Sequence, residues 1–213
     1  MRALARYTVG MADILAYTSD DVPSRMLAQA DPELGVLIDR VGTVESPLWS
    51  GEGFAVIARS IVSQQLSEKA SATIWRRVAE QVGTSPESLV AAPVETLRAA
   101  GLSGRKVEYL QAIARCSLAG EIDWSGLEAL DDEAVIQALV GLRGVGRWTA
   151  EMYLIFALGR PDVLALDDQG LRNTAGRAFG LGRPATRAEL GERGERWRPW
   201  RSVASLWLWG DVG

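Results

Sequence analysis

Histidine is absent from the 213 residues of this chain, and cysteine is present only once. Without histidine there is no imidazole base for a Ser-His-Asp or Cys-His site, and no histidine-bearing metal motif. The single cysteine, Cys116, cannot form an intrachain disulfide or a thiolate cluster for zinc or iron–sulfur. Acid–base chemistry therefore falls to carboxylates, and a reducing, cytoplasmic setting is expected.

Long apolar runs and a secretory leader are missing as well. No window of about twenty residues is continuously apolar, and Met1–Asp20 lacks the basic, apolar and small-residue regions of a signal peptide. We therefore expect no membrane partner. With 47% of its residues apolar, the chain is long enough to bury one core, or two helical subdomains that share a cleft.

Charge is unevenly distributed along the chain. The net charge is −4, but the residues from Gly141 onward carry +3 and the first 140 residues carry −7. Nearly all the cations are arginines, since only Lys69 and Lys106 are lysines. A basic segment on an acidic protein is common without any nucleic acid, so charge alone gives weak support for DNA binding.

Helical signals extend over most of the sequence. Apolar residues recur at helical spacing, and serine, aspartate or proline stands where helices should begin. Helices are expected over Asp31–Arg40, Phe54–Val62, Ser67–Val82, from Ser85, from Pro93, from Ser103, and over Asp131–Val140, Thr149–Leu158, Gln169–Phe179, Arg187–Arg193 and Trp200–Trp209. Only Ala3–Val9 has a strand pattern, and a loop through Leu48 and Trp49 is expected between Gly42 and Gly53. The sequence predicts an all-α fold.

A glycine-rich break separates the helix that ends at Val140 from the next one. In the run Leu142–Gly146 (LRGVG), the glycines allow positive φ and a close approach to the backbone, while Val145 is expected to tuck inward. The first N–H groups of the following helix point outward and, with the helix dipole, favour a phosphate. A tight turn between two packed helices is the alternative.

Four motifs together resemble the helix-hairpin-helix DNA glycosylase superfamily, and within it the 3-methyladenine DNA glycosylase II branch. They are Leu142–Ala150 (LRGVGRWTA), Leu166–Arg172 (LDDQGLR), Ile61–Ser67 (IVSQQLS) and Trp197–Ser202 (WRPWRS). The resemblance implies a base excision repair enzyme that acts on double-stranded DNA with alkylated bases. It also implies a monomer, associated with the nucleoid, that requires no cofactor.

The resemblance also assigns the contacts with DNA. The hairpin is expected to grip the backbone of the lesion strand through Gly144, Val145, Gly146, Arg147 and Thr149. Its carbonyls, those of Leu142 and Val145, are where the family often holds a structural monovalent cation.

Asp168 is the residue that the resemblance marks as catalytic. Cleavage of an N-glycosidic bond builds positive charge on the sugar, so the site needs a fixed anion near the anomeric carbon and a water molecule. The same position suits an N-cap for the following helix. The adjacent Asp167 offers a second carboxylate for that structural role.

A lysine characteristic of some relatives is missing. In the branches that also cleave the DNA backbone, a lysine directly follows the hairpin arginine and forms a Schiff base with the sugar. Here that position is Trp148, and neither Lys69 nor Lys106 lies in the motif. A monofunctional enzyme that leaves an intact abasic site is therefore expected.

Trp148 and Trp209 resemble base-pocket positions of the alkylation-repair branch. Electron-rich indole faces attract a positively charged alkylated purine by stacking and cation–π interactions. Met152 follows Trp148 by about one helical turn, and is expected either on the same pocket wall or in the core. Most of the eight tryptophans should simply be core residues.

Gln64, Gln65 and Leu66 lie at the helix break where the family inserts a side chain into the space left by the flipped base. A solvated polar loop is the alternative. For three arginines, phosphate binding and an ordinary surface charge are equally open: Arg147, Arg172 and Arg201.

The resemblance predicts two helical subdomains with the active-site cleft between them. Residues 53–160 are expected to form a six-helix barrel subdomain that contains the helix-hairpin-helix. Residues 1–52 together with 161–213 are expected to form a second helical subdomain that supplies the catalytic aspartate. The segment before Phe54 looks too short for the extra domain of mixed sheet and helix that longer family members carry.

Two other functions stay open at this point. A non-catalytic helix-hairpin-helix protein would bind DNA but would have no need of a carboxylate among aromatic residues. A glycosylase for mismatched or deaminated bases would keep the catalysis. Many relatives of that kind carry a cysteine cluster, which this chain cannot build.

Overall fold

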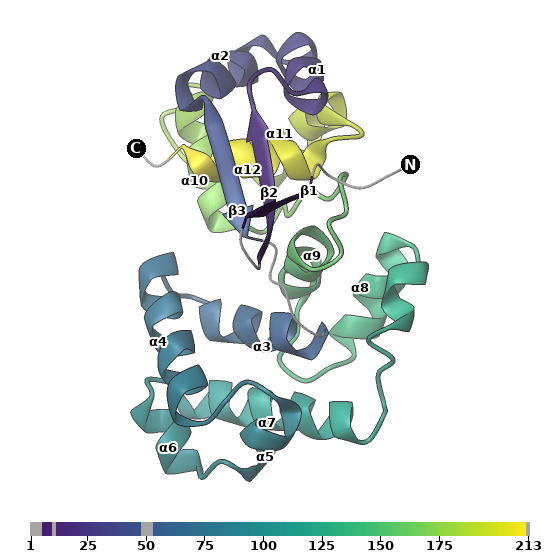
Figure 1. The fold of residues 1–213 in the computed structure, drawn as a ribbon. Helices are drawn as coiled ribbons and strands as arrows, with labels where there is room; N and C mark the ends of the chain where they lie inside the picture. The colour runs from purple at the N-terminus through teal and green to yellow at the C-terminus, as the bar shows by residue number, and fades with distance from the viewer. Residues whose placement is uncertain (1–5, 10–11, 48–52, 212–213) are drawn as a thin grey trace. The chain divides into compact units, whose positions relative to one another are not determined.

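A computed structural model of the chain describes residues 6–9, 12–47 and 53–211. The chain divides into two compact units: unit 1 comprises Met1–Ser50 with Leu154–Gly213, and unit 2 comprises Gly51–Tyr153. Figure 1 labels the elements of both units. The sequence analysis expected subdomains divided at residues 53 and 160, one with the hairpin and one with the catalytic aspartate. That assignment of roles stays a prediction.

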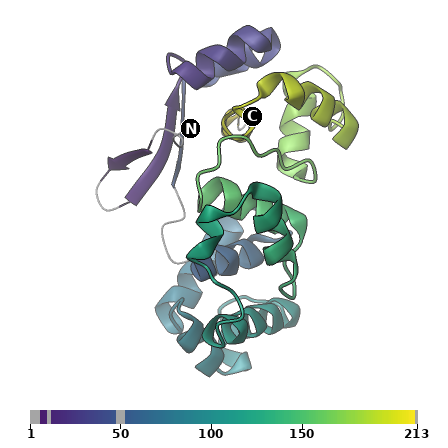
Figure 2. The same ribbon diagram turned by 90° about the vertical axis from the view of Figure 1, so that its right-hand side faces the viewer.

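Unit 1 contains a small antiparallel sheet in the order β1-β2-β3, formed by β1 (Arg6–Val9), β2 (Ala12–Thr18) and β3 (Thr43–Pro47). Figure 2 shows these strands, drawn as separate arrows in purple. Leu15 and Tyr17 of β2 are fully buried, as expected for alternate residues on the face of a strand that covers a core.

Helix α12 (Arg201–Gly210) forms the centre of unit 1. It contacts β3 and three helices, and in Figure 1 it runs, in yellow, behind β2 and β3. Every residue from Ser202 to Leu208 is buried, because the helix is covered on all sides. The other helical segments of this unit are α1 (Val22–Ala30), α2 (Pro32–Val41), α10 (Gln169–Ala178), α11 (Arg187–Gly194) and the 3₁₀ turn Glu195–Trp197.

Unit 2 is helical throughout its described residues, and helix α7 (Gly104–Leu118) contacts three of its other helices, α3, α5 and α6. Its remaining segments are α3 (Gly53–Ser63), α4 (Glu68–Gln81), α5 (Pro86–Ala91), α6 (Val94–Ala99), the 3₁₀ turn Gly126–Ala129, α8 (Asp132–Val140) and α9 (Arg147–Phe156). The boundary between the units at residue 153 falls inside α9.

The mainly helical fold is confirmed. At five expected helix starts the capping side chain accepts a hydrogen bond from the backbone N–H three residues later, as a helix N-terminus requires. These residues are Asp31, Ser67, Ser85, Ser103 and Asp131. No helix in the described ranges is long and apolar enough to cross a bilayer.

The expectations for the first fifty residues were wrong in part. Helix α1 and strand β2 were missed, and the loop expected after Gly42 is strand β3 as far as Pro47. Residues 3–5 of the expected N-terminal strand, and Leu48 and Trp49 of the expected loop, lie outside the described residues. Strand β1 lies within the strand expected over Ala3–Val9. Strands β2 and β3 were missed because they are short, and because they pair with each other across two intervening helices.

Candidate functional site

Asp168 lies at the N-terminus of α10 and is hydrogen-bonded to a tryptophan. Its Oδ1 accepts the backbone N–H of Leu171 at 2.6 Å and the Nε1–H of Trp209 at 3.0 Å. The residue is half-buried. The aspartate is therefore the N-cap of α10, and the same oxygen fixes its carboxylate against an indole from α12.

Asp167 does not take the capping role suggested for it. It is exposed and forms an ion pair with Arg187, with 3.0 Å between Oδ1 and Nη1. The cap falls to Asp168 because the N-cap is the residue directly before the first helical residue, which is Gln169. The candidate catalytic residue and the cap are thus one side chain.

Two residues that the sequence analysis did not single out pack around this pair: Phe156 lies against the indole of Trp209, and Gly170 lies next to the carboxylate of Asp168. The ring of Phe156 packs against Trp209 with centroids 5.8 Å apart and planes tilted by 31°. A Cβ placed on Gly170 would lie 3.2 Å from Oδ1 of Asp168 and 3.9 Å from Cδ1 of Trp209. A side chain at Gly170 would crowd the carboxylate. A glycine in the first turn of a helix, where it lowers helix stability, was the available signal.

The hairpin of unit 2 is built around Gly144, whose φ is +88°. A side chain at this position would meet the ring of Tyr109 from α7, so both the backbone conformation and the close packing require glycine. Val145 is buried, as expected, and its N–H donates to the carbonyl of Leu142 at 3.1 Å. Gly146 is exposed, and a Cβ there would meet nothing within 4 Å.

Gln64 is tied to the hairpin. Its Nε2 donates to the carbonyl of Gly144 at 3.0 Å and to Oγ1 of Thr149 at 3.2 Å. Thr149 is itself only 1% exposed. The exposed residues of the same helix break are Gln65, which has a φ of +59°, and Leu66. Of the three residues considered for insertion into DNA, these two point outward.

Lys106 makes contacts at the same helix break that the sequence analysis did not predict. Its Nζ donates to the carbonyls of Val62 and Gln64, at 2.7 and 2.8 Å, where α3 ends. Burial lowers the pKa of Lys106. The scarcity of lysine in the sequence was the only signal that pointed to this residue.

Arg147 is held by two carboxylates. Its Nη2 lies 3.0 Å from Oε2 of Glu133 and its Nε lies 3.1 Å from Oε1 of Glu151. Its guanidinium is still half exposed. A phosphate contact by Arg147 would therefore compete with ion pairs within the unit.

The other two arginines considered for phosphate binding make internal contacts in unit 1. Nε of Arg172 donates to the carbonyl of Ala185 at 2.7 Å. Nε of Arg201 donates to Oδ1 of Asp162 at 2.7 Å, and only 17% of the arginine side chain is exposed. Both guanidinium groups contribute to the packing of this unit.

The proposed pocket residues are distributed over both units. Trp209 belongs to unit 1, whereas Trp148 and Met152 belong to unit 2. Trp148 is half-buried and Met152 is 4% exposed, which agrees with the core alternative for the methionine. The pocket formed by these three side chains stays a prediction.

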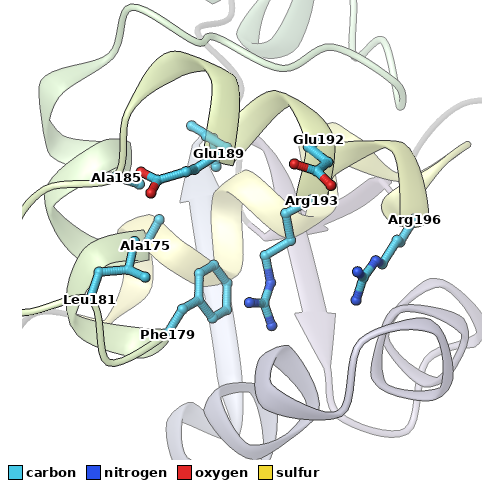
Figure 3. Close-up of a pocket in the computed structure, with 9 residues that line it drawn as sticks. Ala175, Phe179, Leu181, Ala185, Glu189, Glu192, Arg193 and Arg196 are labelled. Atoms are coloured by element: carbon cyan, nitrogen blue, oxygen red, sulfur yellow. The ribbon is translucent and has the colours of Figure 1, made fainter.

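Unit 1 also contains a cavity of about 250 Å³ that does not include Asp168 (Figure 3). There the guanidinium of Arg193 stacks on the ring of Phe179 at 3.5 Å and forms two 2.6 Å hydrogen bonds with buried Asp31. The other residues that line the cavity are Ala175, Leu181, Ala185, Glu189, Leu190, Glu192 and Arg196. Because Arg193 is fully engaged by carboxylates, this cavity is a poor candidate for the active site.

No group of three or more Cys, Asp or Glu side chains within the described part of the chain is arranged to hold a metal ion. The suggested monovalent cation would use backbone oxygens instead. Of the two carbonyls, that of Leu142 accepts the N–H of Val145 at 3.1 Å. The cation stays a prediction.

Comparison with known proteins gives one family. The model of the HhH-GPD superfamily of base excision DNA repair proteins matches residues 58–199. An alkylbase DNA glycosidase-like protein of Schizosaccharomyces pombe is 31% identical over 190 residues, which cover 86% of this chain and 89% of that protein.

Solved structures agree with this. The chain is similar to a DNA-3-methyladenine glycosidase from Bacillus halodurans, with a TM-score of 0.76 and 35% identity over 92% of this chain and 93% of the other. It is also similar to a 3-methyladenine DNA glycosylase of Schizosaccharomyces pombe in complex with abasic DNA. That match has a TM-score of 0.84 and 31% identity, and covers 89% of this chain and 95% of the other.

Proposed function

Because this chain belongs to the HhH-GPD superfamily of base excision DNA repair proteins, we propose that it is a monofunctional DNA glycosylase for alkylated bases of the 3-methyladenine type. It flips the damaged base out of double-stranded DNA and hydrolyses the N-glycosidic bond, acting as a cytoplasmic, nucleoid-associated monomer without a required cofactor. The names of the similar proteins support the substrate class. The observation that carries the chemistry is the carboxylate of Asp168, held by Leu171 and Trp209.

Asp168 is proposed to stabilise the sugar as the base leaves. When the bond from C1′ to the base nitrogen breaks, its electron pair goes to the base and positive charge develops on the sugar. A carboxylate that is already oriented opposes this charge without reorganising during the reaction. Water then adds to C1′, and its proton passes to the carboxylate of Asp168 and from there to solvent, so that a free base and an abasic site result.

Selection of the damaged base is proposed to use indole faces. An alkylated purine with positive charge is attracted to tryptophan by cation–π interactions of about 0.5–2 kcal/mol each. Trp209, backed by Phe156, carries both a ring face and the hydrogen bond to Asp168. Trp148 is proposed as a further pocket residue, and Met152 as packing that supports it.

The hairpin is proposed to bind the DNA backbone. Gly146 is exposed and precedes α9, whose first N–H groups have no partner within the helix and suit a phosphate. Gln65 and Leu66 are proposed to insert into the space left by the flipped base. A monovalent cation on the carbonyls of Leu142 and Val145 would add positive charge at the same point.

Absence of lyase activity is the remaining part of the proposal. A Schiff base needs a lysine nitrogen at the sugar, and Trp148 occupies the position after the hairpin arginine. The Nζ of Lys106 donates hydrogen bonds to two backbone carbonyls within unit 2. Borohydride reduction during turnover should therefore trap no covalent complex with DNA.

Base release from methylated duplex DNA tests the proposal. Asn is as good an N-cap as Asp, so Asp168→Asn keeps α10 capped while it removes the charge. We expect excision to fall by about 10²-fold or more with the fold intact. Asp167→Asn, which loses only the exposed pair with Arg187, is the matched control and should excise at the wild-type rate.

Other results of this assay would favour one of the alternative functions. Wild-type protein that binds the DNA but releases no more base than Asp168→Asn would be a non-catalytic binding protein. Release of uracil, or of a mismatched base, in preference to methylated bases would move the substrate to the other class. A borohydride-trapped complex would contradict the monofunctional mechanism.

A further inference from the structure

Three elements of unit 2 meet at the end of α3, and two side chains join them. Lys106 of α7 donates to the carbonyls of Val62 and Gln64, at 2.7 and 2.8 Å. Gln64 in turn donates from Nε2 to the carbonyl of Gly144 and to Oγ1 of Thr149. The end of α3 is thus connected on one side to α7 and on the other to the hairpin.

The positions of these contacts in the chain matter. The last carbonyls of a helix have no hydrogen-bond donor within the helix. Here the ammonium group of Lys106 donates to two of them, those of Val62 and Gln64. Directly after this anchor come Gln65 and Leu66, both exposed, the first with a φ of +59°. A non-glycine residue with positive φ has to be held by its surroundings, and the bonds to Val62 and Gln64 provide such a constraint.

We propose that Lys106 is a positioning residue, which with Gln64 holds the outward turn Gln65–Leu66 in a set position relative to the hairpin. This inference rests on the proposed function, in which the hairpin binds the backbone and the turn inserts into the base stack. In this mechanism the hairpin holds the DNA backbone while the turn is inserted, because insertion offsets part of the cost of flipping the base out of the duplex. Lys106 lies outside the motifs that touch DNA and acts through the backbone.

Chemistry favours lysine at this position over the arginine that the chain uses nearly everywhere else. The ammonium is a compact group with three donors, and two of them serve carbonyls two residues apart. Tyr109, on the same face of α7 one turn later, packs under Gly144. Helix α7 therefore supports both parts of the DNA-binding surface, through Lys106 at the turn and through Tyr109 at the hairpin.

The test compares a paired lesion with an unpaired one. In Lys106→Met the side-chain stem remains and the donors are lost. We expect single-turnover excision from duplex DNA to fall by about ten-fold or more, because the turn is no longer in position for insertion. Excision of the same lesion placed in a single-nucleotide bulge, where little flipping cost remains, should stay within about three-fold of wild type.

A second measurement reports flipping without chemistry. The fluorescence of 2-aminopurine beside the lesion should rise on binding of wild type and of Asp168→Asn, and should rise less with Lys106→Met. The matched control is Arg98→Met, which removes an exposed cation from α6 of the same unit and should change neither reading.

Two results would overturn the inference. An equal loss on the paired and the bulged substrate would mean that Lys106 only supports the fold. Unchanged duplex excision and unchanged fluorescence would mean that the turn needs no anchor. Failure of the proposed function has a different signature: wild type would release no base, while the fluorescence comparison between wild type and Lys106→Met would still report on positioning.

Discussion

The indole of Trp209 donates a hydrogen bond to Oδ1 of Asp168 at 3.0 Å, and the same oxygen accepts the N–H of Leu171 at 2.6 Å. Helix α12, the central helix of unit 1, thereby sets the direction of a carboxylate that caps α10. A carboxylate held in one direction before the substrate arrives is what electrostatic stabilisation of a sugar cation requires.

Trp209→Phe should slow excision while leaving most of the ring contact with Phe156. The variant loses a hydrogen bond to a charged group, worth about 1.5–3 kcal/mol, so the rate should fall by about ten-fold or more. Trp207→Phe is the control, because its Nε1–H donates to Ser24 in the core at 3.1 Å and not to the carboxylate. Single-turnover rates and thermal unfolding should separate the two: Trp207→Phe lowers stability only.

Gly144→Ala should destabilise unit 2, because it places a side chain at a φ of +88° and against Tyr109. The expected loss is about 1–3 kcal/mol in the free energy of unfolding. Gly146→Ala is the matched control, since a Cβ there meets nothing within 4 Å, and it should change stability by less than about 0.5 kcal/mol. Equal stability of the two variants in denaturant titrations would contradict this account.

Asp31 should make the stability of unit 1 depend on acid pH. Burial alone would raise the pKa of Asp31. Hydrogen bonds from Arg193, Trp197 and the N–H of Leu34, with the charge of Arg193, nevertheless hold it below the ordinary value of 3.8. Since the folded pKa lies below the unfolded one, the carboxylate stabilises the protein above about pH 4, and this contribution is lost as the pH falls through the folded pKa.

Asp31→Asn tests this, because asparagine still caps α2. At neutral pH the variant should lose about 2–4 kcal/mol of unfolding free energy, since Arg193 loses its buried partner. Its stability should also fall less steeply than that of wild type below pH 3.8. Glu33→Gln removes the exposed partner of Arg193 and should cost no more than about 1 kcal/mol. A wild-type acid profile in Asp31→Asn would refute the assignment.

Glu133→Gln should strengthen DNA binding. Glu133 is 57% exposed and pairs with Arg147 at the start of α9, so its loss leaves the hairpin more positive. We expect affinity to rise by about two- to three-fold at low salt, and the gain to shrink as salt is added. Glu80→Gln, from an equally exposed pair with Arg76 on α4, is the control. Fluorescence anisotropy at two salt concentrations would show the difference, and equal affinities would argue against a phosphate near Arg147.

Local patterns explain why much of the fold was predictable. A cap and the N–H that it binds lie three residues apart, so Asp31, Ser67 and Asp131 could be identified without any tertiary information. The hairpin motif and the aspartate before α10 are also contiguous segments. Strand β2 was missed because seven residues give little signal on their own, and only one of its two partners, β1, is close in the chain, whereas β3 lies beyond α1 and α2.

The amino-acid sequence by itself determined the helical character of the chain, the family, and the candidate carboxylate, because each depends on residues adjacent in the chain. Only the tertiary structure decided that Trp209 holds the carboxylate of Asp168, that Gln64 turns inward to the hairpin, and that Lys106 anchors the end of α3. Those outcomes depend on partners between 41 and 85 residues away in the chain. Such choices are made by packing, which no local pattern encodes.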